Sequence, residues 1–197
     1  MISLNPNTIS DLDSKKILNG AIIPRPVAFV TSSHDNATLN GAPFSYFNIV
    51  SSTPPLIMIA VNRRDNKMKD TAINILETEE FVVHLIDEDN LGNINATAES
   101  LSIKESEVLK HGLTPVESTI VQTRGIKESK VRFECVLEKY IELENTDMFI
   151  GRVVFYHLEE SIYKNGKIQL DKYNVVGRLS GSNYSTIGKI IEIERPQ

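Results

Sequence analysis

The chain has no tryptophan, a single cysteine and no long apolar segment, and the last two shortages each exclude a class of protein. One cysteine, Cys135, excludes an internal disulfide and a metal site built from several cysteines. The longest clean apolar run, residues 56–61, is far too short to cross a bilayer, and residues 1–12 lack the pattern of a secretion signal. We therefore expect a cytoplasmic protein that makes no contact with a membrane.

Positive charge is also scarce for a chain of 197 residues. There are 21 basic and 26 acidic residues, which gives a net charge of −5, and the two signs are interspersed along the sequence. No basic stripe is present to neutralise the phosphates of a nucleic acid, so nucleic acid is not expected as a partner. The hydrophobic content of 41% is enough for one good-sized core, and we expect a single domain over residues 1–197.

Motifs of hydrolytic, metal-dependent and nucleotide-binding enzymes are missing as well. The four histidines are scattered without metal-ligand spacing, and no HExxH, nucleophile elbow, P-loop or GxGxxG occurs. We therefore predict no metal site and name no catalytic side chain. His84 lies in the apolar segment FVVHLI and is predicted to be a hydrogen-bonded core histidine. Cys135, in VRFECVLEKY, is predicted to be a buried structural thiol.

Periodicity along the chain predicts mostly β-strands. Many strands, few helices and no strand–helix alternation favour an antiparallel barrel with helices on its outside. A helix is predicted from Asp70, because Met68, Ala72, Ile75 and Leu76 would share one of its faces. Further strands are predicted at 26–32, 38–44, 56–61 and 81–86, a long hairpin over 129–160 that turns at 145–147, one or two polar helices within 88–110, and a surface loop over 112–128.

Polar residues gather at two places that suit ligand binding. The strand that follows Pro24 and Pro26 ends in the hydroxyl run 31–33, and the segment 45–53 is again rich in hydroxyl and amide groups. Such groups suit contact with a ligand rich in oxygen and nitrogen. The core-packing alternative remains open for the two aromatic residues Tyr46 and Phe47, whereas the polar Asn48 between apolar neighbours suggests a hydrogen-bonding role.

The segment KDTAIN at 69–74 is the best phosphate candidate. A helix start presents unpaired N–H groups and a partial positive charge, and Lys69 and Thr71 add a cation and a hydroxyl at the same end. Asp70 is predicted to cap this helix. The alternative is that Lys69 is simply solvated and Asp70 acts only as the cap. Arg63 and Arg64 lie just upstream and are within reach of a phosphate, unless they belong to an ordinary charged loop.

Four segments together resemble a known family. They are PRPVAFVTS from Pro24, NGAPFSYFNIVSSTPP from Asn40, KDTAIN from Lys69 and GRLSGSNY from Gly177. The chain resembles flavin-reductase-like proteins with an FMN-binding split barrel, especially their flavoredoxin-type branch. The resemblance implies an antiparallel split β-barrel that is mainly β with peripheral helices. It also implies that FMN is bound at a homodimer interface.

The resemblance also assigns roles to residues in these segments. Thr31 and Ser32 match positions at the end of the first strand, against which the flavin ring lies. The segment that lines the ring and ribityl chain is matched by Ser45, Tyr46, Phe47 and Asn48, and the phosphate end by Lys69, Asp70 and Thr71.

The role of the segment 177–184 distinguishes between the possible functions. The resemblance suggests that it approaches the open face of the flavin, where Arg178 and Tyr184 would meet NAD(P)H, although a purely structural turn is the alternative. Family members often have Gly-Gly and a further basic residue where this chain has Ser180–Gly181 and Ser185–Thr186, which leaves the electron donor open. The leading prediction is an NAD(P)H-dependent flavin reductase that passes electrons to free flavin or another acceptor, including a redox protein. The alternatives are a flavoredoxin-type electron carrier and a non-catalytic flavin-binding module.

Overall fold

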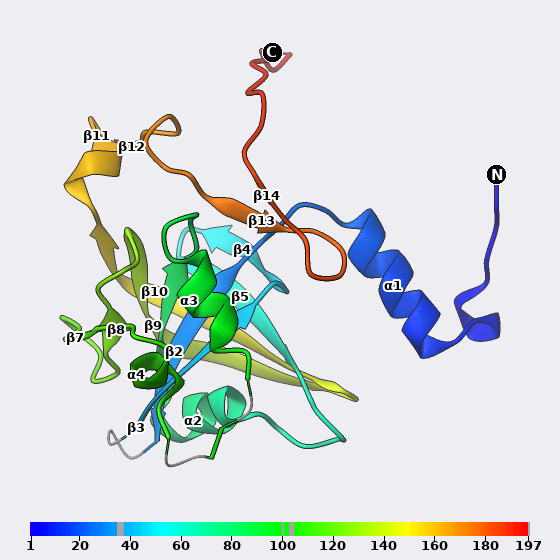
Figure 1. Ribbon diagram of the computed structural model, residues 1–197, viewed down its shortest axis with the longest axis horizontal. Coiled ribbons are helices and arrows are strands. Elements are labelled where there is room, and N and C mark those ends of the chain that lie inside the picture. The colour runs from blue at the N-terminus through cyan, green and yellow to red at the C-terminus, as the bar shows by residue number, and fades with distance from the viewer. Residues whose placement is uncertain (35–37, 100, 103–104, 197) are drawn as a thin grey trace.

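The computed structural model describes residues 1–34, 38–99, 101–102 and 105–196, which are organised around one curved antiparallel sheet (Figure 1). Seven strands form this sheet in the order β3-β2-β6-β9-β10-β5-β4, and each neighbouring pair is antiparallel. Their bounds are Ala28–His34 for β2, Thr38–Phe44 for β3, Phe47–Ser52 for β4, Pro55–Asn62 for β5, Glu80–Leu85 for β6, Val131–Leu143 for β9 and Thr146–Leu158 for β10.

The two edge strands, β3 and β4, follow each other in the chain and are joined by Ser45 and Tyr46. Within the described residues these edges do not pair with each other, so the curved sheet stays open along one line. A curled sheet of this kind is a split barrel. The prediction of a mainly β, antiparallel split barrel with peripheral helices is confirmed. Ser45 and Tyr46 therefore lie at the split.

Strands β9 and β10 form the long hairpin predicted over 129–160, but its turn differs from the prediction. The ladder pairs Leu143 with Thr146, so Glu144 and Asn145 make the turn and the predicted position 145–147 was wrong. Asp147 belongs to β10 and is fully buried, where the Arg63 guanidinium lies 2.7 Å from its carboxylate. Asparagine and aspartate two residues apart are typical of turns, and the sequence does not reveal the distant partner of Asp147.

The main core lies between the sheet and helix α2 (Asp70–Thr78). Ala72 and Ile75 of α2 are fully buried, and Met68 and Leu76 pack beside them, as their helical spacing predicts. Strand β2 contacts α2, and its residues 28–33 are all buried. This explains why β2 reads as a nearly continuous apolar and hydroxyl run rather than as an alternating one.

Smaller elements surround the sheet and fix its loops. A three-stranded sheet in the order β1-β13-β14 combines Arg25–Pro26, Val176–Arg178 and Tyr184–Thr186, which come from the two ends of the chain. The other elements are the 3-10 turns η1 (Pro6–Thr8) and η2 (Glu160–Ile162), the helices α1 (Asp11–Ala21), α3 (Leu91–Ala96) and α4 (Glu107–Lys110), and the short strands β7 (Pro115–Val116), β8 (Gly125–Ile126), β11 (Tyr163–Lys164) and β12 (Lys167–Ile168).

Residues 112–128, which we call the strap, are held firmly against the sheet rather than forming a free surface loop. The fully buried carboxylate of Glu134 accepts hydrogen bonds from the backbone N–H groups of Thr119, Ile120 and Val121, at 2.6, 2.6 and 3.1 Å. His157 Nε2 lies 2.6 Å from the same carboxylate. Burial alone would raise the pKa of Glu134, but these hydrogen bonds lower it below its ordinary value. The strap is therefore anchored by a carboxylate inside the fold.

The single cysteine and one histidine occupy the buried positions that the sequence predicts. Cys135 is fully buried, and burial raises the pKa of its thiol, so it stays protonated and unreactive. His84 is also fully buried, with Nδ1 3.0 Å from the carbonyl oxygen of Phe29 and Nε2 3.0 Å from the backbone nitrogen of Ile126. Burial lowers the pKa of His84 to about 3. Both predictions are confirmed.

Helix α1 projects from the body of the molecule and was not predicted (Figure 1). Its N-cap Ser10 accepts a hydrogen bond from the backbone nitrogen of Asp13 and donates one to the Asp13 carboxylate. No residue of α1 is buried, and Leu12 and Leu18 remain 62% and 54% exposed. None of the described helices combines the length and apolar character that a membrane span requires.

Candidate functional site

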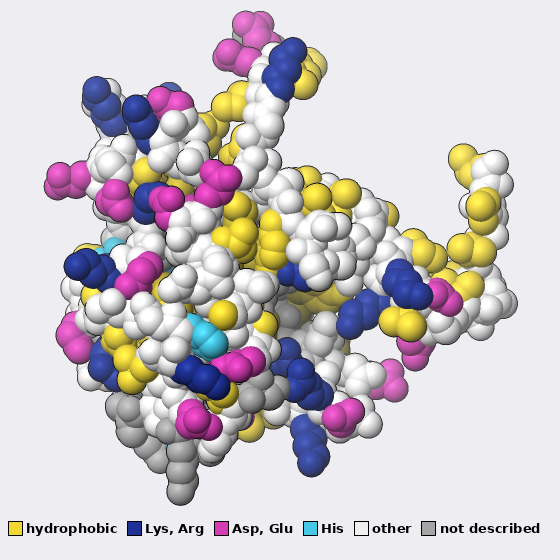
Figure 2. Space-filling view, in the orientation of Figure 1, with side chains coloured by type: hydrophobic (Ala, Val, Ile, Leu, Met, Phe, Trp, Pro, Cys, Tyr) yellow, Lys and Arg dark blue, Asp and Glu magenta, His cyan; other side chains and the backbone are white. Residues whose placement is uncertain are grey.

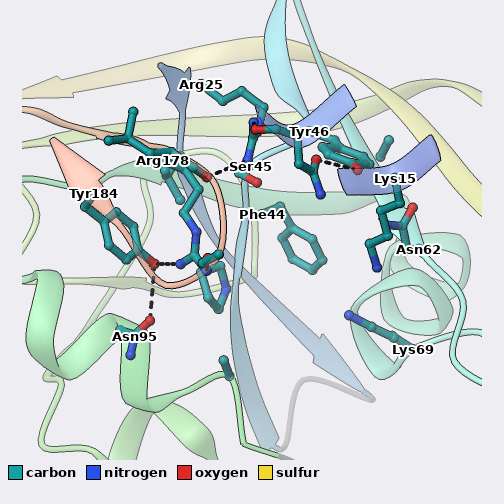
Figure 3. A pocket seen from close by; sticks show the side chains of 17 residues that line it. Lys15, Arg25, Phe44, Ser45, Tyr46, Asn62, Lys69, Asn95, Arg178 and Tyr184 are labelled. Carbon is teal, nitrogen blue, oxygen red and sulfur yellow. Dashed lines mark hydrogen bonds between the residues drawn. The ribbon is translucent and has the colours of Figure 1, made fainter. Parts of the chain in front are cut away.

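A hollow of about 420 Å³ opens at the split of the barrel, between α1, α3 and the β13–β14 hairpin (Figure 3). Its wall brings together segments that are far apart in the sequence. They are the connection between β3 and β4, the start of α2 and the β13–β14 hairpin. Of the predicted site residues, the structure brings five to this first hollow: Ser45, Tyr46, Lys69, Arg178 and Tyr184.

A second hollow of about 310 Å³ adjoins the first one. Pro43, Lys69 and Ala98 line both, so the two form one continuous depression with Lys69 at the junction. The second hollow also contains Asp70 and Thr71, which completes the predicted phosphate segment. Figure 2 shows Lys and Arg side chains around the depression between the body of the molecule and α1.

The start of helix α2 is uncapped, and this corrects the role predicted for Asp70. Lys69 is the N-cap residue and makes no side-chain capping bond, while Asp70 is the first helical residue. Asp70 therefore does not cap α2. The first N–H groups of a helix need a partner, and no side chain in the described part of the chain caps α2. The Thr71 hydroxyl lies behind this end, where it accepts a hydrogen bond of 3.0 Å from Asn40.

Positive charge collects at the junction of the two hollows. Lys69 Nζ lies 5.8 Å from the centre of the Phe44 ring, and no ion pair of Lys69 is found among the residues that the structure describes. Burial first, and then the charges of Arg64 and Lys15, lower the pKa of Lys69. These three cations therefore lie near one another and favour the binding of an anion.

Carboxylates are also present, but they lie on the side away from the first hollow. The second hollow is lined by Asp65, Asp70, Glu99 and Glu107, and none of these lines the first. Burial and the charge of Asp70 raise the pKa of Glu107. The most positive part of the depression is consequently its junction at Lys69, rather than its far end.

Arg63 and Arg64, which the sequence left as phosphate candidates, have different environments. The Arg63 guanidinium is committed to Asp147, Glu142 and Tyr140 through several hydrogen bonds, so it is not available to a ligand. Arg64 lines the second hollow, near Lys69. Only the second of these arginines is placed to assist an anion at the junction.

The floor and one wall of the first hollow are apolar or aromatic. Phe44, Val27, Pro43 and Ala60 line it, together with Tyr46. The Tyr46 hydroxyl donates a hydrogen bond of 2.9 Å to the side-chain oxygen of Asn19 in α1, which leaves its ring as part of the wall. A flat apolar surface beside a few polar groups suits a planar, partly polar ligand.

Arg25 links the end of α1 to the β13–β14 hairpin. Its guanidinium donates to the carbonyl oxygens of Asn19 and Ile22 at the end of α1, at 2.8 and 2.7 Å, and to that of Leu179 in the hairpin, at 3.0 Å. Its Nε is buried and has no hydrogen-bond partner within the described part of the chain. Arg25 thus fixes α1 and the hairpin relative to each other and leaves one donor unused.

The β13–β14 hairpin packs so closely on β1 that one of its glycines is required. A Cβ atom on Gly177 would lie 2.7 Å from Cβ of Pro24, which is too close for any side chain. At the tip, Gly181 has φ +63°, a conformation that favours glycine. The glycines of GRLSG therefore have structural reasons in this fold.

Arg178 and Tyr184 face each other across this hairpin. Arg178 donates hydrogen bonds to the Tyr184 hydroxyl and to the carbonyl oxygen of Gly181, and its guanidinium carbon lies 4.5 Å from the centre of the Tyr184 ring. The Tyr184 hydroxyl in turn donates to Asn95 Oδ1 of α3, at 3.2 Å. Figure 3 shows this chain of contacts along one side of the first hollow. The pair links the hairpin to α3.

Four of the predicted residues do not line either hollow. Thr31 and Ser32 are fully buried; the Thr31 hydroxyl donates to the carbonyl oxygen of Arg124, and the Ser32 hydroxyl accepts from Asn40 and Asn74. Phe47 is a core residue, so the core-packing alternative holds for it. Asn48 is exposed on edge strand β4, where its side chain accepts from the backbone nitrogen of Ile49. Contact of these four with a flavin stays a prediction, and no geometry here supports it.

Sequence reasoning missed Lys15, Asn19, Arg25 and Asn95, which all line the first hollow. The first two were missed because α1 was not predicted. The Ser10–Asp13 capping pair and the following Leu12, Lys15 and Leu18 were the available signal for it. No local pattern points to Arg25 or Asn95, because their roles depend on contacts with Leu179 and Tyr184, far away in the sequence.

Comparison with known proteins agrees with this geometry. The family model "Flavin reductase like domain" matches residues 20–170. An uncharacterized protein of Bacillus subtilis, YwrF, is 45% identical over the full length of both chains. Nitrilotriacetate monooxygenase component B from Bacillus cereus has a structure with TM-score 0.96 and 46% identity, covering 98% of each chain. The structure of 2-nitrobenzoate 2-nitroreductase from Pseudomonas fluorescens has TM-score 0.91 and 28% identity, covering 99% of this chain and 96% of that one. The chain therefore belongs to the flavin-reductase-like family of flavin-binding oxidoreductases.

Proposed function

We propose that each subunit binds one FMN non-covalently in the continuous depression and acts as an NAD(P)H-dependent flavin reductase. The observation that carries this proposal is the uncapped start of α2 beside Lys69, at the junction of an aromatic hollow and a polar one. Free N–H groups and an ammonium group favour a phosphate, and the hollow next to them has the flat apolar wall that a flavin ring requires.

The residues present fit FMN better than they fit a flavin without a phosphate. Lys69 and the first N–H groups of α2 would hold the phosphate, and Phe44, Ser45 and Tyr46 would border the ring. Bound FMN would supply the redox chemistry, because a flavin accepts a hydride from a nicotinamide and passes electrons to a second acceptor.

The side of the hollow formed by Arg178 and Tyr184 is our candidate for the donor site. Arg178 carries a fixed positive charge that suits a nucleotide phosphate, and Tyr184 presents a ring on which a base or nicotinamide can stack. The relative from Bacillus cereus is a component of a monooxygenase, and the one from Pseudomonas fluorescens reduces a nitroaromatic acid. Both names support a protein that receives electrons and delivers them to an acceptor.

We further propose a homodimer. On α1, Leu12, Ile17 and Leu18 are exposed, and on the edge strand β4, Ile49 and Val50 are 73% and 48% exposed. A second copy of the chain that covered these faces would remove apolar surface from water and would also enclose the open side of the site. Light scattering with FMN present should give the mass of a dimer at micromolar concentration, and a monomer would contradict this part of the proposal.

Titration of the purified protein with FMN and riboflavin tests the cofactor assignment. We expect saturable binding of FMN at micromolar concentration or below, with weaker binding of riboflavin because it lacks the phosphate. Quenching of flavin fluorescence reports both affinities. Absence of saturable FMN binding would remove the central proposal.

Stopped-flow reduction of the bound flavin separates the proposed reductase from the alternatives. Rapid bleaching of the flavin absorbance by NADH or NADPH is the expected result, and the faster of the two identifies the donor. Reduction only by a reduced redox protein would instead indicate an electron carrier. A flavin that neither donor nor redox protein reduces would indicate a flavin-binding module.

A further inference from the structure

Lys15 is a charged side chain for which the described residues supply no carboxylate partner. It lines the first hollow from α1, and its charge helps to lower the pKa of Lys69, so the two ammonium groups lie close enough to repel each other. In the described ranges of the chain, neither Lys15 nor Lys69 forms an ion pair with a carboxylate. Figure 3 shows both side chains on the same side of the hollow, next to Asn62. Two unbalanced cations at one place favour an anion between them.

The neighbouring lysine of α1 has the opposite environment. Lys16 Nζ lies 3.1 Å from the Asp13 carboxylate, and both side chains are exposed. Lys16 does not line either hollow of the depression. The two adjacent lysines have the same chemistry and sit on the same helix, but only Lys15 is directed to the site.

Few contacts hold α1 on the barrel. No residue of the helix is buried, and its polar contacts with the barrel are the bond between Asn19 and Tyr46 and the bonds from Arg25 to its last turn. Lys15 and Asn19 are four residues apart and therefore share the face that meets the hollow. An anion bound at Lys15 would add a contact one turn further along the helix.

We propose that Lys15 of α1 binds the phosphate of the flavin together with Lys69 and the start of α2, and that this phosphate holds α1 against the barrel. The inference rests on the proposed FMN site, and it adds α1 as a part of that site. It makes Lys15 a specificity-determining residue for flavins that carry a phosphate. It also makes the position of α1 dependent on the cofactor.

The binding consequence is tested with Lys15→Ala, its matched control Lys16→Ala, and Lys69→Ala. Lys15 is exposed, so solvent weakens its attraction for the phosphate. We therefore expect its loss to weaken FMN binding roughly three- to ten-fold. Riboflavin binding should not change. Lys16→Ala should bind both flavins as the unmodified protein does, and Lys69→Ala should lose affinity for FMN.

The structural consequence is tested by hydrogen exchange over residues 11–21. FMN, but not riboflavin, should slow exchange of the α1 amides in the unmodified protein and in Lys16→Ala. In Lys15→Ala, the two flavins should give the same exchange, because nothing then links the phosphate to the helix. This readout does not depend on catalysis.

The outcomes separate this inference from the proposed function. If the unmodified protein does not prefer FMN to riboflavin, and Lys69→Ala changes nothing, the proposed phosphate site is wrong. If Lys69→Ala loses the preference but Lys15→Ala retains it, only the role of Lys15 is overturned. Equal losses for FMN and riboflavin in Lys15→Ala would place Lys15 at the ring instead. A defect confined to the NAD(P)H reaction would assign Lys15 to the donor.

Discussion

Two regions of the barrel balance their charges in opposite ways. One is the strap side, next to residues 112–128, and the other is the split side, where the first hollow opens between the edge strands β3 and β4. At the strap, the buried carboxylate of Glu134 is matched inside the fold by three backbone N–H groups and by His157. At the split, Lys15 and Lys69 lie near each other without a carboxylate partner among the described residues.

This difference distinguishes charges that stabilise the fold from charges that await a ligand. A buried ion with all of its hydrogen bonds made contributes to folding and has no capacity left for a substrate. Cations that repel each other at the edge of a hollow weaken the free protein and gain from any anion that binds there. Changes on the strap side should therefore alter stability, whereas changes on the split side should alter ligand affinity.

The largest effect is expected for Glu134→Gln. The amide cannot accept the hydrogen bonds of three N–H groups and His157 as a carboxylate does, so buried donors are left unsatisfied. The free energy of unfolding at pH 7 should fall by about 3 kcal/mol or more. Urea unfolding followed by circular dichroism measures this loss.

Glu138→Gln provides the control on the same strand. Glu138 forms an exposed pair with Arg152, so its substitution should cost less than about 1 kcal/mol. The pH dependence gives a second check. Because the pKa of Glu134 in the fold is below its ordinary value of 4.5, its contribution is fully present above pH 4.5 and is lost as the pH falls through the lower value. The stability difference between the unmodified protein and Glu134→Gln should shrink over that range, and a constant difference would contradict it.

The next effect is the loss of FMN affinity in Lys69→Ala. A direct charge-assisted contact with the phosphate is worth roughly 1.5–3 kcal/mol, which corresponds to about ten-fold or more in the dissociation constant. Riboflavin should be bound as before, and the free energy of unfolding without flavin should not decrease, because removing Lys69 relieves its repulsion with Lys15 and Arg64. Fluorescence titration and urea unfolding of the same variant check both statements.

An equal loss for FMN and riboflavin would place Lys69 away from the phosphate. A marked loss of stability without flavin would show that Lys69 belongs to the fold, and the contrast between the two sides of the barrel would then fail at its central residue.

The sequence predicted the framework of this molecule better than its surface. The strands 38–44 and 81–86 and the apolar face of α2 were predicted nearly to the residue, because their patterns reflect burial along a single element. Segment 47–52 was interpreted as a ligand loop, but it forms edge strand β4. Its polar residues Asn48, Ser51 and Ser52 lie at the edge of the sheet, and the sequence does not distinguish such a position from contact with a ligand.

Candidate site residues were recognised where one segment supplies the chemistry and missed where two distant segments meet. Lys69 and Thr71 lie where a helix start would place them, whereas Thr31 and Ser32 are used inside the fold by Arg124, Asn40 and Asn74. Lys15 carries no local signal of its place at the first hollow, because that place depends on how α1 lies against the distant segment that contains Lys69. Long-range pairing of this kind is decided by tertiary packing.

The smallest effect tests whether the split side itself is divided into a cofactor part and a donor part. Arg178→Ala and Tyr184→Ala remove the two residues that border the hollow opposite Lys15 and Lys69. Each should weaken the apparent affinity for NAD(P)H about ten-fold, since one charge-assisted or stacking contact is lost, while the FMN dissociation constant changes little. Tyr184→Phe is the matched control, because it keeps the ring and removes only the hydroxyl contacts with Arg178 and Asn95. If stacking is what matters, Tyr184→Phe should retain most of the rate of flavin reduction in stopped-flow experiments. Variants that released FMN but reduced the retained flavin normally would show that the β13–β14 hairpin belongs to the cofactor site, because the hairpin would then act on the same ligand as Lys69.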